Sequence, residues 1–231
     1  MHPPNLRTFL KELQLPLYAL ELLTQQKNLL QDNPYHFDEQ PVLVIPGFGA
    51  SDNSTYFLRR FLTKTGLSVY GWGLGKNNGN VKKTLPELIE KIATIHNTHN
   101  EKVTLIGWSL GGIIARELSR MTTEKIRGVC CLGSPIVGGA AYTIYARLFE
   151  QLGKDLSKIA QLAHRRESVP IRVPSHVIYS KKDGIVHWEA CIDQFNPHTT
   201  HTELDTPHFS MGTSVEMYQE ISRWLNTLYE G

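Results

Sequence analysis

The residues best suited to chemistry form the pentapeptide GWSLG at positions 107–111, which matches the pattern G-x-S-x-G. An apolar strand pattern at 103–108 precedes the serine, and an amphipathic helical pattern at 110–121 follows it. Glycines two positions before and after Ser109 permit a sharp strand-to-helix turn, because no Cβ group obstructs the bend. The start of the helix would supply free N–H groups and a field that favours negative charge. The pattern therefore predicts that Ser109 is a catalytic nucleophile; a chance match in a glycine-rich turn is the alternative.

A serine hydroxyl is a poor nucleophile, so it needs a base, usually a histidine that a carboxylate orients. Where the serine lies on such a turn, the three residues follow the chain order serine, acid, histidine. Asp183 comes just after a predicted strand at 173–180, where an open α/β sheet places its functional groups. Asp193 falls in a predicted helix and Asp205 lies close in sequence to the best histidine. Asp183 is therefore the preferred acid, and an ordinary turn aspartate is the alternative.

His208 is the preferred base among the 10 histidines. It lies in the sequence TPHF at 206–209, on a predicted loop between a short strand pattern at 200–204 and the last helix. His187 follows the acid too closely to approach the serine from the other side. The remaining candidates are His164, His198 and His201.

The negative charge that develops on a substrate carbonyl oxygen needs N–H donors already in place. One donor is expected to be the backbone N–H of Leu110, directly after the nucleophile. The second is expected in the loop PGFG at 46–49, after the first core strand, where the N–H of Phe48 would point at the oxyanion. Phe48 would act through its backbone and not through its side chain.

Two histidine pairs have i, i+3 spacing, which suits a metal ion, but no cysteine or carboxylate stands at ligand spacing beside them. The stretch GWGLGK at 71–76 lacks the spacing of a phosphate-binding loop and is predicted to be a flexible loop bordering the active site. We therefore expect neither a metal ion nor an organic cofactor. The histidine pairs are His96 with His99 and His198 with His201.

Short β-branched runs alternate with longer helical patterns from residue 41 onward. This alternation is typical of an α/β fold, with a mostly parallel sheet covered by helices on both faces. The predicted strands are residues 42–45, 67–71, 103–108, 126–132, 173–180 and 200–204. The predicted helices are residues 84–99 (with Pro86 in the first turn), 110–121 and 211–229, together with a helix that Ser54 or Thr55 caps and that runs to about residue 65.

Residues 1–35 precede this alternation and are predicted to form an amphipathic helical segment packed on the domain of residues 36–231. A helix lying on a membrane surface is the alternative, which the acidic residues and glutamines of the polar face disfavour. The residues at helical spacing on the expected packing face are Leu17, Leu20, Leu23, Lys27 and Leu30.

The connection between the predicted strands at 126–132 and 173–180 is longer than a crossover helix needs. Its apolar residues are spaced for one or two amphipathic helices, so residues 138–170 are predicted to form a short helical lid or cap. A plain crossover helix with a loose loop is the alternative. The residues of this insertion expected to contact substrate are Tyr142, Tyr145 and Phe149.

The composition excludes several classes of protein. Hydrophobic residues make up 41% and charged residues 20%, which is typical of a folded globular chain and not of a disordered or coiled-coil one. A net charge of +2 without a basic block gives no sign of nucleic-acid binding. The 3 cysteines cannot form a disulfide framework, and no run reaches the roughly 18 apolar residues of a spanning helix. We expect a cytoplasmic protein without a signal peptide, with membrane association left open.

Five stretches resemble the α/β-hydrolase superfamily and, within it, the small bacterial lipases and esterases. They are VLVIPGFG at 42–49, TLIGWSLGG at 104–112, LGSPIVG at 132–138, IYSKKDGIV at 178–186 and TPHF at 206–209.

The resemblance implies a compact sheet of about six strands. It implies the same roles as the residue patterns above: Ser109 as nucleophile, Asp183 as acid and His208 as base. The oxyanion donors that it implies are Phe48 and Leu110. The motif GSP at 133–135 is similar to a turn in true lipases and so implies lipid-like esters. The chain departs from many relatives at Pro46, where they have a histidine, and this removes a side-chain anchor of the oxyanion loop.

The sequence thus predicts a serine esterase or lipase that works through a Ser-His-Asp triad and an acyl-enzyme. An acyltransferase or thioesterase with the same triad is one alternative, and a non-catalytic ligand-binding protein of the same fold is another. The expected partner is a small-molecule ester or lipid, and no nucleic acid. Peripheral membrane contact through the N-terminal helix or the lid is left open.

Overall fold

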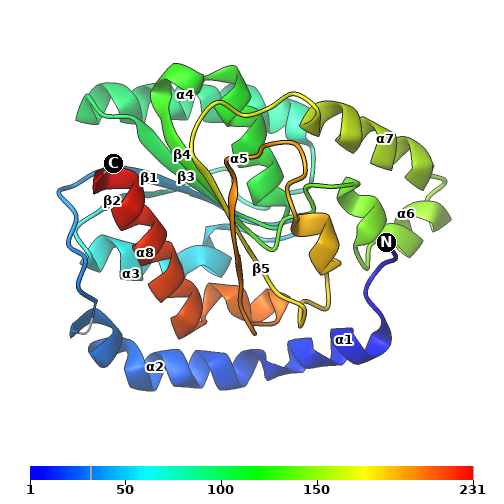
Figure 1. The fold of residues 1–231 in the computed structure, drawn as a ribbon, viewed down its shortest axis with the longest axis horizontal. Coiled ribbons are helices and arrows are strands. Elements are labelled where there is room, and N and C mark those ends of the chain that lie inside the picture. The colour runs from blue at the N-terminus through cyan, green and yellow to red at the C-terminus, as the bar shows by residue number, and fades with distance from the viewer. Residues whose placement is uncertain (32, 231) are drawn as a thin grey trace.

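The computed structural model describes residues 1–31 and 33–230, which are built around a six-stranded sheet (Figure 1). The strand order is β2-β1-β3-β4-β5-β6, and every neighbouring pair is parallel. This confirms the predicted fold class. Because all strands run the same way, their carboxyl ends meet at one edge of the sheet. The strands are β1 (Pro41–Ile45), β2 (Ser68–Gly71), β3 (Val103–Trp108), β4 (Ile126–Leu132), β5 (Ser175–Tyr179) and β6 (Thr200–Glu203).

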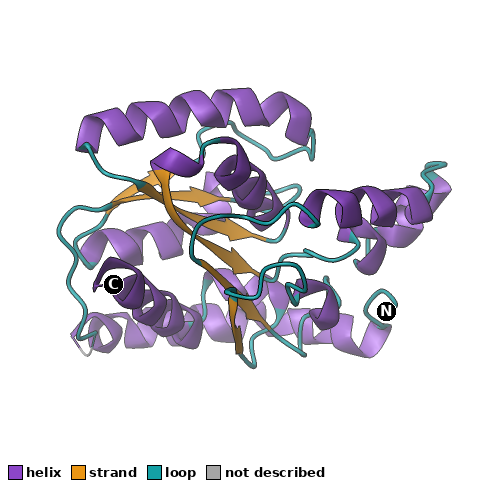
Figure 2. Cartoon of the chain, turned by 45° about the horizontal axis from the view of Figure 1, so that its top comes forward, coloured by secondary structure: helices purple, strands orange, loops and turns teal. Residues whose placement is uncertain are grey.

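Helices cover both faces of the sheet, as Figures 1 and 2 show. Apolar residues of α4 and α5 form one buried cluster with one face, and those of α2, α3 and α8 form a second cluster with the other. The helices are α1 (Leu6–Leu10), α2 (Leu15–Gln31), α3 (Tyr56–Lys64), α4 (Val81–His99), α5 (Leu110–Met121), α6 (Ala146–Gln151), α7 (Leu156–Glu167) and α8 (Val215–Glu230). Short 3₁₀ turns include η1 (Lys11–Gln14), η4 (Gly139–Tyr142) and η6 (His208–Gly212).

Two helices begin at residues other than those predicted, and side-chain caps explain both differences. The Asn80 side chain accepts the N–H of Lys83, so α4 begins at Val81 and Pro86 lies in its second turn instead of its first. The Ser214 hydroxyl accepts the N–H of Met217 at 3.3 Å. Helix α8 therefore begins after that serine, and the preceding stretch forms η6.

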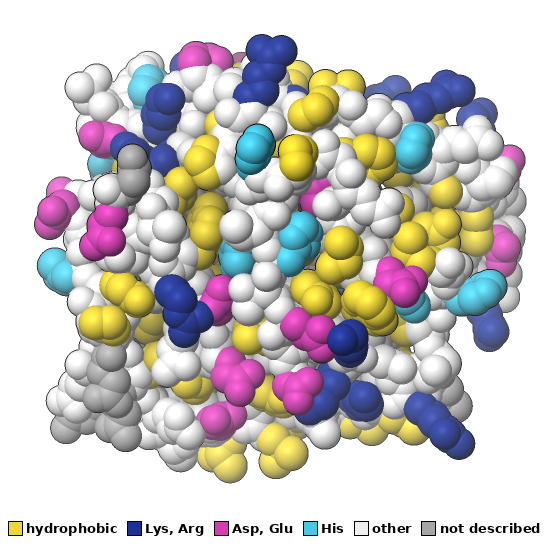
Figure 3. Space-filling view, in the orientation of Figure 1, with side chains coloured by type: hydrophobic (Ala, Val, Ile, Leu, Met, Phe, Trp, Pro, Cys, Tyr) yellow, Lys and Arg dark blue, Asp and Glu magenta, His cyan; other side chains and the backbone are white. Residues whose placement is uncertain are grey.

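The N-terminal helix α2 packs on the body through a different face from the one predicted. Leu22 and Leu29 are buried, whereas Leu17, Leu20 and Leu23 are more than half exposed. Figure 3 shows apolar side chains projecting from the lower edge of the molecule, where this segment runs. The prediction was wrong because leucines stand on both sides of the helix, so their spacing alone does not select a face. Leu30 is partly buried, and the side chain of Lys27 lies outside the described residues.

The insertion between β4 and β5 contains η4, α6 and α7. Its last helix is anchored by a buried ion network. The guanidinium of Arg116, on α5, pairs with Glu167 at 2.9 Å and with Asp193 at 2.8 Å, and Arg120 pairs with Glu167 at 2.6 Å. These contacts fix the carboxyl end of α7 to the helix that follows Ser109.

None of the helices in the described part of the chain is long and apolar enough to cross a membrane.

A matched pair of substitutions tests which face of α2 carries the packing. Leu22→Ala should lower the free energy of unfolding by about 2–5 kcal/mol, because it leaves a cavity in the buried cluster. Leu20→Ala removes an exposed side chain and should change that free energy by no more than about 0.5 kcal/mol. Denaturant unfolding of both variants is the measurement, and equal losses would contradict the assignment of the buried face.

Candidate active site

Ser109 lies on the turn between β3 and α5 with a strained backbone. Its φ of 56° and ψ of −121° are rare for a residue with a side chain. The Ser109 N–H donates to the carbonyl of Leu132 at 2.8 Å, which ties the turn to the end of β4. The strained conformation presents the serine at the carboxyl edge of the sheet.

The two glycines of the pentapeptide occupy positions where no Cβ fits. A Cβ at Gly107 would collide with the backbone carbonyl of Gly111, and a Cβ at Gly111 would collide with the carbonyl oxygen of Ile45 on β1. The turn is therefore compact because the backbone of α5 touches both β3 and β1. This close approach is the physical reason for the glycines of the pattern.

Asp183 and His208 form a buried hydrogen-bonded pair. Asp183 Oδ2 lies 2.6 Å from His208 Nδ1, and both side chains are almost fully buried. The other oxygen of Asp183 accepts the N–H groups of Ile185 at 2.8 Å and Val186 at 2.7 Å. Because Asp183 follows β5 and His208 follows β6, the parallel sheet brings the two loops together at its carboxyl edge.

The pKa of His208 lies above its ordinary value of 6.5. Burial lowers this pKa, but the charge of Asp183, its hydrogen bond and the charge of Glu12 raise it by more. Burial lowers the pKa of His176 and of His201, for which neighbouring carboxylates do not compensate fully. His208 thus differs from His176 and His201 because its carboxylate neighbours raise its pKa by more than burial lowers it.

Ser109 and His208 line the same cavity of about 120 Å³. The Ser109 hydroxyl makes no hydrogen bond with the His208 imidazole in this structure, and the His208 ring lies 6.0 Å from the Trp108 ring between centroids. The structure therefore joins the predicted acid and base directly and brings the predicted nucleophile into the cavity that His208 lines. Catalytic hydrogen bonds often tighten only when substrate is bound.

The N–H groups of Phe48 and Leu110 donate to no acceptor in the described part of the chain, which leaves both free to bind a ligand oxygen. A Cβ at Gly47 would lie 3.1 Å from the Cβ of Ser109, so this loop passes directly beside the serine. Leu110 is the first residue of α5, where N–H groups have no partner within the helix.

Asn77 holds the loop that carries Phe48, and the sequence analysis missed it. The buried Asn77 side chain donates to the Pro46 carbonyl at 2.9 Å, and its backbone carbonyl accepts the Gly49 N–H at 2.7 Å. These bonds anchor the loop at Pro46 and at Gly49. An asparagine in a glycine-rich loop gave no local signal for this long-range contact.

The loop at 71–76, predicted to be flexible, is tied down by hydrogen bonds. The carboxylate of Asp52 accepts the N–H groups of Trp72 at 2.9 Å and Gly73 at 3.0 Å. The buried Trp72 indole donates to the Gly75 carbonyl at 2.9 Å. The expectation of a flexible loop therefore disagrees with these contacts.

A second, larger cavity of about 650 Å³ opens beside Ser109, between the sheet edge and the insertion. Its lining is mainly apolar and includes Tyr145 and Phe149, two of the three residues expected to contact substrate. Tyr142 does not line it; this ring packs against Gly138 and the buried core. The Phe48 and Tyr145 rings meet edge to face, 5.4 Å apart, where the two cavities adjoin.

Within the described residues, no group of three or more His, Cys, Asp or Glu side chains is arranged to hold a metal ion. The histidine pairs noted in the sequence have other contacts. His99 Nε2 lies 2.7 Å from the Tyr70 hydroxyl, and His201 Nε2 accepts the Asp193 N–H at 3.0 Å.

Together, the parallel sheet, the serine on its strand-to-helix turn and the histidine–aspartate pair at the same edge define an α/β hydrolase by fold. The chain belongs to the PGAP1-like alpha/beta domain family, whose sequence profile matches residues 76–214. A comparison with curated proteins finds no match.

Solved structures with the same fold include several lipases. A structure from work on LipS and LipT, two metagenome-derived lipolytic enzymes, superposes with a TM-score of 0.67 at 14% identity, over 85% of this chain and 96% of that one. The monoacylglycerol lipase of Paleococcus ferrophilus gives 0.60 at 18% identity, over 83% and 97%. A soluble variant of the monoglyceride lipase of Saccharomyces cerevisiae gives 0.63 at 14% identity, over 85% and 89%. These similarities establish the fold.

The raised pKa of His208 is testable by NMR titration. The imidazole should titrate above pH 6.5, and Asp183→Asn should lower its pKa, because the burial remains after the charge is removed. The pair should stabilise the fold fully below the unfolded-state pKa, and this contribution should decline as the pH rises through the folded-state value.

Asp205→Asn is the matched control for that titration. Asp205 is exposed and pairs with Lys182, so its substitution should leave the His208 titration unchanged. A His208 pKa below 6.5 in the wild-type protein, or a pKa that Asp183→Asn leaves unchanged, would contradict the conclusion that Asp183 raises the pKa of His208.

Proposed function

We propose that the protein is a serine hydrolase of carboxylic esters, with Ser109 as nucleophile, His208 as base and Asp183 as the carboxylate that orients it. The observation that carries this proposal is the buried 2.6 Å contact between His208 and Asp183, beside the cavity that Ser109 enters on a strained turn. A serine in that conformation at the carboxyl edge of a parallel sheet is suited to attack a bound carbonyl group. The lipase and esterase neighbours of the same fold support an ester or lipid substrate.

In the proposed reaction, Ser109 Oγ bonds to the ester carbonyl carbon and its proton passes to His208. The N–H groups of Phe48 and Leu110 stabilise the oxyanion. The carbon–oxygen bond to the alcohol then breaks, and the histidine returns its proton to the alcohol oxygen, which leaves an acyl-enzyme. Water activated by His208 attacks the acyl carbon, releases the acid and restores the serine. Asp183 stabilises the imidazolium that forms in both halves of the reaction.

We further propose that the two cavities receive the two halves of the ester. The alcohol must leave on the side of His208, which protonates it, and the cavity there is only about 120 Å³. The acyl chain then extends into the apolar cavity of about 650 Å³ under the insertion. We therefore propose that residues 138–170 form a cap over an acyl-binding site, and that the preferred substrates have long apolar acyl groups and small alcohols.

Removal of the serine hydroxyl tests the proposed nucleophile. Ser109→Ala should lower kcat for a p-nitrophenyl ester by more than about 10⁴-fold and abolish labelling by a fluorophosphonate, because it removes the hydroxyl that forms the proposed acyl-enzyme. Ser54→Ala is the matched control, since Ser54 lines the same cavity without a proposed role. Unchanged hydrolysis by Ser109→Ala, or no labelling of the folded wild-type protein, would contradict the proposal.

A series of p-nitrophenyl esters from acetate to palmitate tests the acyl-binding site. The wild type should prefer the longer chains, and Ile159→Trp should reduce kcat/KM for them by about tenfold while sparing the acetate, because the larger ring fills the cavity. Leu152→Trp alters an exposed residue of the same insertion outside the cavity and should keep the wild-type profile. If Ile159→Trp left the dependence of kcat/KM on chain length unaltered, the acyl chain would have to bind outside this cavity.

A further inference from the structure

The N-terminal segment contributes a carboxylate to the site. Glu12, on the 3₁₀ turn η1, is only 5% exposed, although Leu10 and Leu13 beside it point outward and are more than half exposed. The usual pattern of apolar residues inside and charged residues outside is reversed at this turn. Burial of a carboxylate costs free energy unless hydrogen bonds or ion pairs compensate its desolvation.

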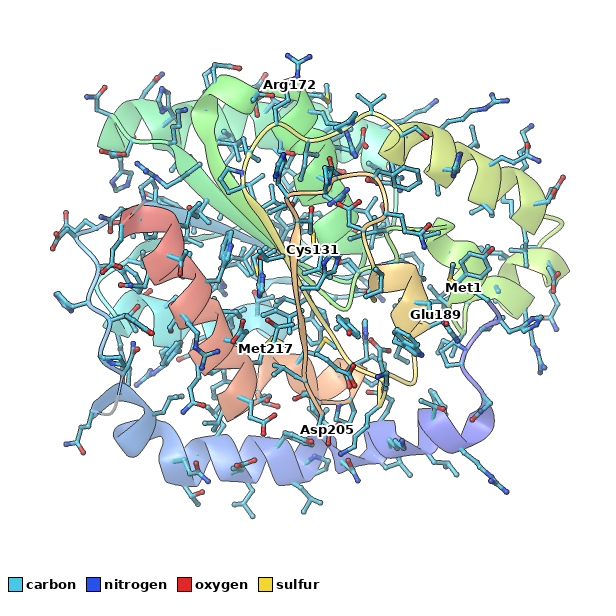
Figure 4. All side chains as sticks on the ribbon, in the orientation of Figure 1. Met1, Cys131, Arg172, Glu189, Asp205 and Met217 are labelled. Carbon is cyan, nitrogen blue, oxygen red and sulfur yellow. The ribbon has the colours of Figure 1, made fainter. Side chains whose placement is uncertain are left out.

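The Glu12 carboxylate accepts three backbone N–H groups. Oε1 accepts Gly184 at 2.7 Å and His208 at 2.9 Å, and Oε2 accepts Phe209 at 2.7 Å. Gly184 follows the proposed acid directly, and the other two donors are the proposed base and its neighbour. One side chain thus connects the two loops whose side chains meet at 2.6 Å. Nearby, the Tyr18 hydroxyl of α2 donates to the Asp205 carbonyl at 3.0 Å, and Figure 4 shows Asp205 lying against this segment.

The chemistry of the contact requires a carboxylate. All three partners are donors, and in the described part of the chain Glu12 pairs with no lysine, arginine or histidine side chain. The three N–H bonds therefore compensate the desolvation of the charge. A glutamine has the same shape but only one acceptor oxygen, so its amide NH₂ would face the N–H of Phe209.

We propose that Glu12 is a positioning residue of the active site: it fixes the Asp183 loop against the His208 loop and places a second negative charge beside His208. This inference rests on the proposed function, since it assigns the group that organises the proposed acid and base. Among the described residues, the charged groups that act on His208 are Asp183 and Glu12. The uncharged groups beside it include the rings of Trp108 and Phe209, the Ser109 turn, Gly133 and Met211. Both charges stabilise the imidazolium that forms when the serine loses its proton.

Glu12→Gln should lower kcat for a p-nitrophenyl ester by about tenfold or more with little change in KM, because the base is displaced while the cavities are retained. The acid limb of the pH profile of kcat/KM should move to lower pH, because one of the charges that favour the protonated imidazole is removed. Glu21→Gln, an exposed glutamate on α2 of the same segment, should behave as the wild type. A fall in kcat with an unmoved acid limb would overturn the proposal in favour of a merely structural contact.

Two further measurements keep the inference separate from the proposed function. NMR titration of His208 in Ser109→Ala, with and without Glu12→Gln, needs no activity; the glutamine should lower the imidazole pKa, and an unchanged value would overturn the inference whether or not esters are hydrolysed. If Glu12→Gln does not fold, Glu12→Ala serves instead: acetate should restore part of its activity and chloride at the same ionic strength should not. Equal effects of the two salts would also overturn it.

Discussion

The close approach of the β3–α5 turn to the end of β1 is the constraint on which the rest of the site depends. A side chain at Gly111 would collide with the Ile45 carbonyl, so only glycine lets the first turn of α5 lie there. That contact places the free N–H of Leu110 beside the loop that carries Phe48, and it holds Ser109 in its unusual backbone conformation. The strain at one residue is therefore maintained by contacts among three strands.

Around this rigid turn, the site is assembled from loops that follow different strands, and carboxylates determine how they meet. Asp183 accepts backbone N–H groups through one oxygen and faces the imidazole through the other. Glu12 accepts three more N–H groups from the same two loops. Burial alone would favour a neutral imidazole, and these two charges together with the Asp183 hydrogen bond outweigh it. The electrostatics of His208 is thus a property of three segments of the chain.

The sequence predicted the features that depend on local pattern. The strands, the glycines around Ser109 and the aspartate after β5 follow from apolar periodicity and turn chemistry, which neighbouring residues largely determine. The packing face of α2 could not be predicted in this way, because leucines occupy both sides of the helix and tertiary contacts select Leu22 and Leu29. Asn77 and Glu12 were missed for a related reason. Each acts on backbone groups far away in sequence, and no motif records such a contact.

The Glu12 contacts have a consequence for the order of events during synthesis. The N–H groups of Gly184 and His208 lie 172 and 196 residues further along the chain, so Glu12 leaves the ribosome well before these partners and cannot bind them until they emerge. The sheet up to β4 can pair while this early segment is still unattached, and docking comes after the loop at 207–209 has emerged. Such distant closures are slow steps of folding. A nascent chain would therefore pair its first four strands before the candidate site can be completed.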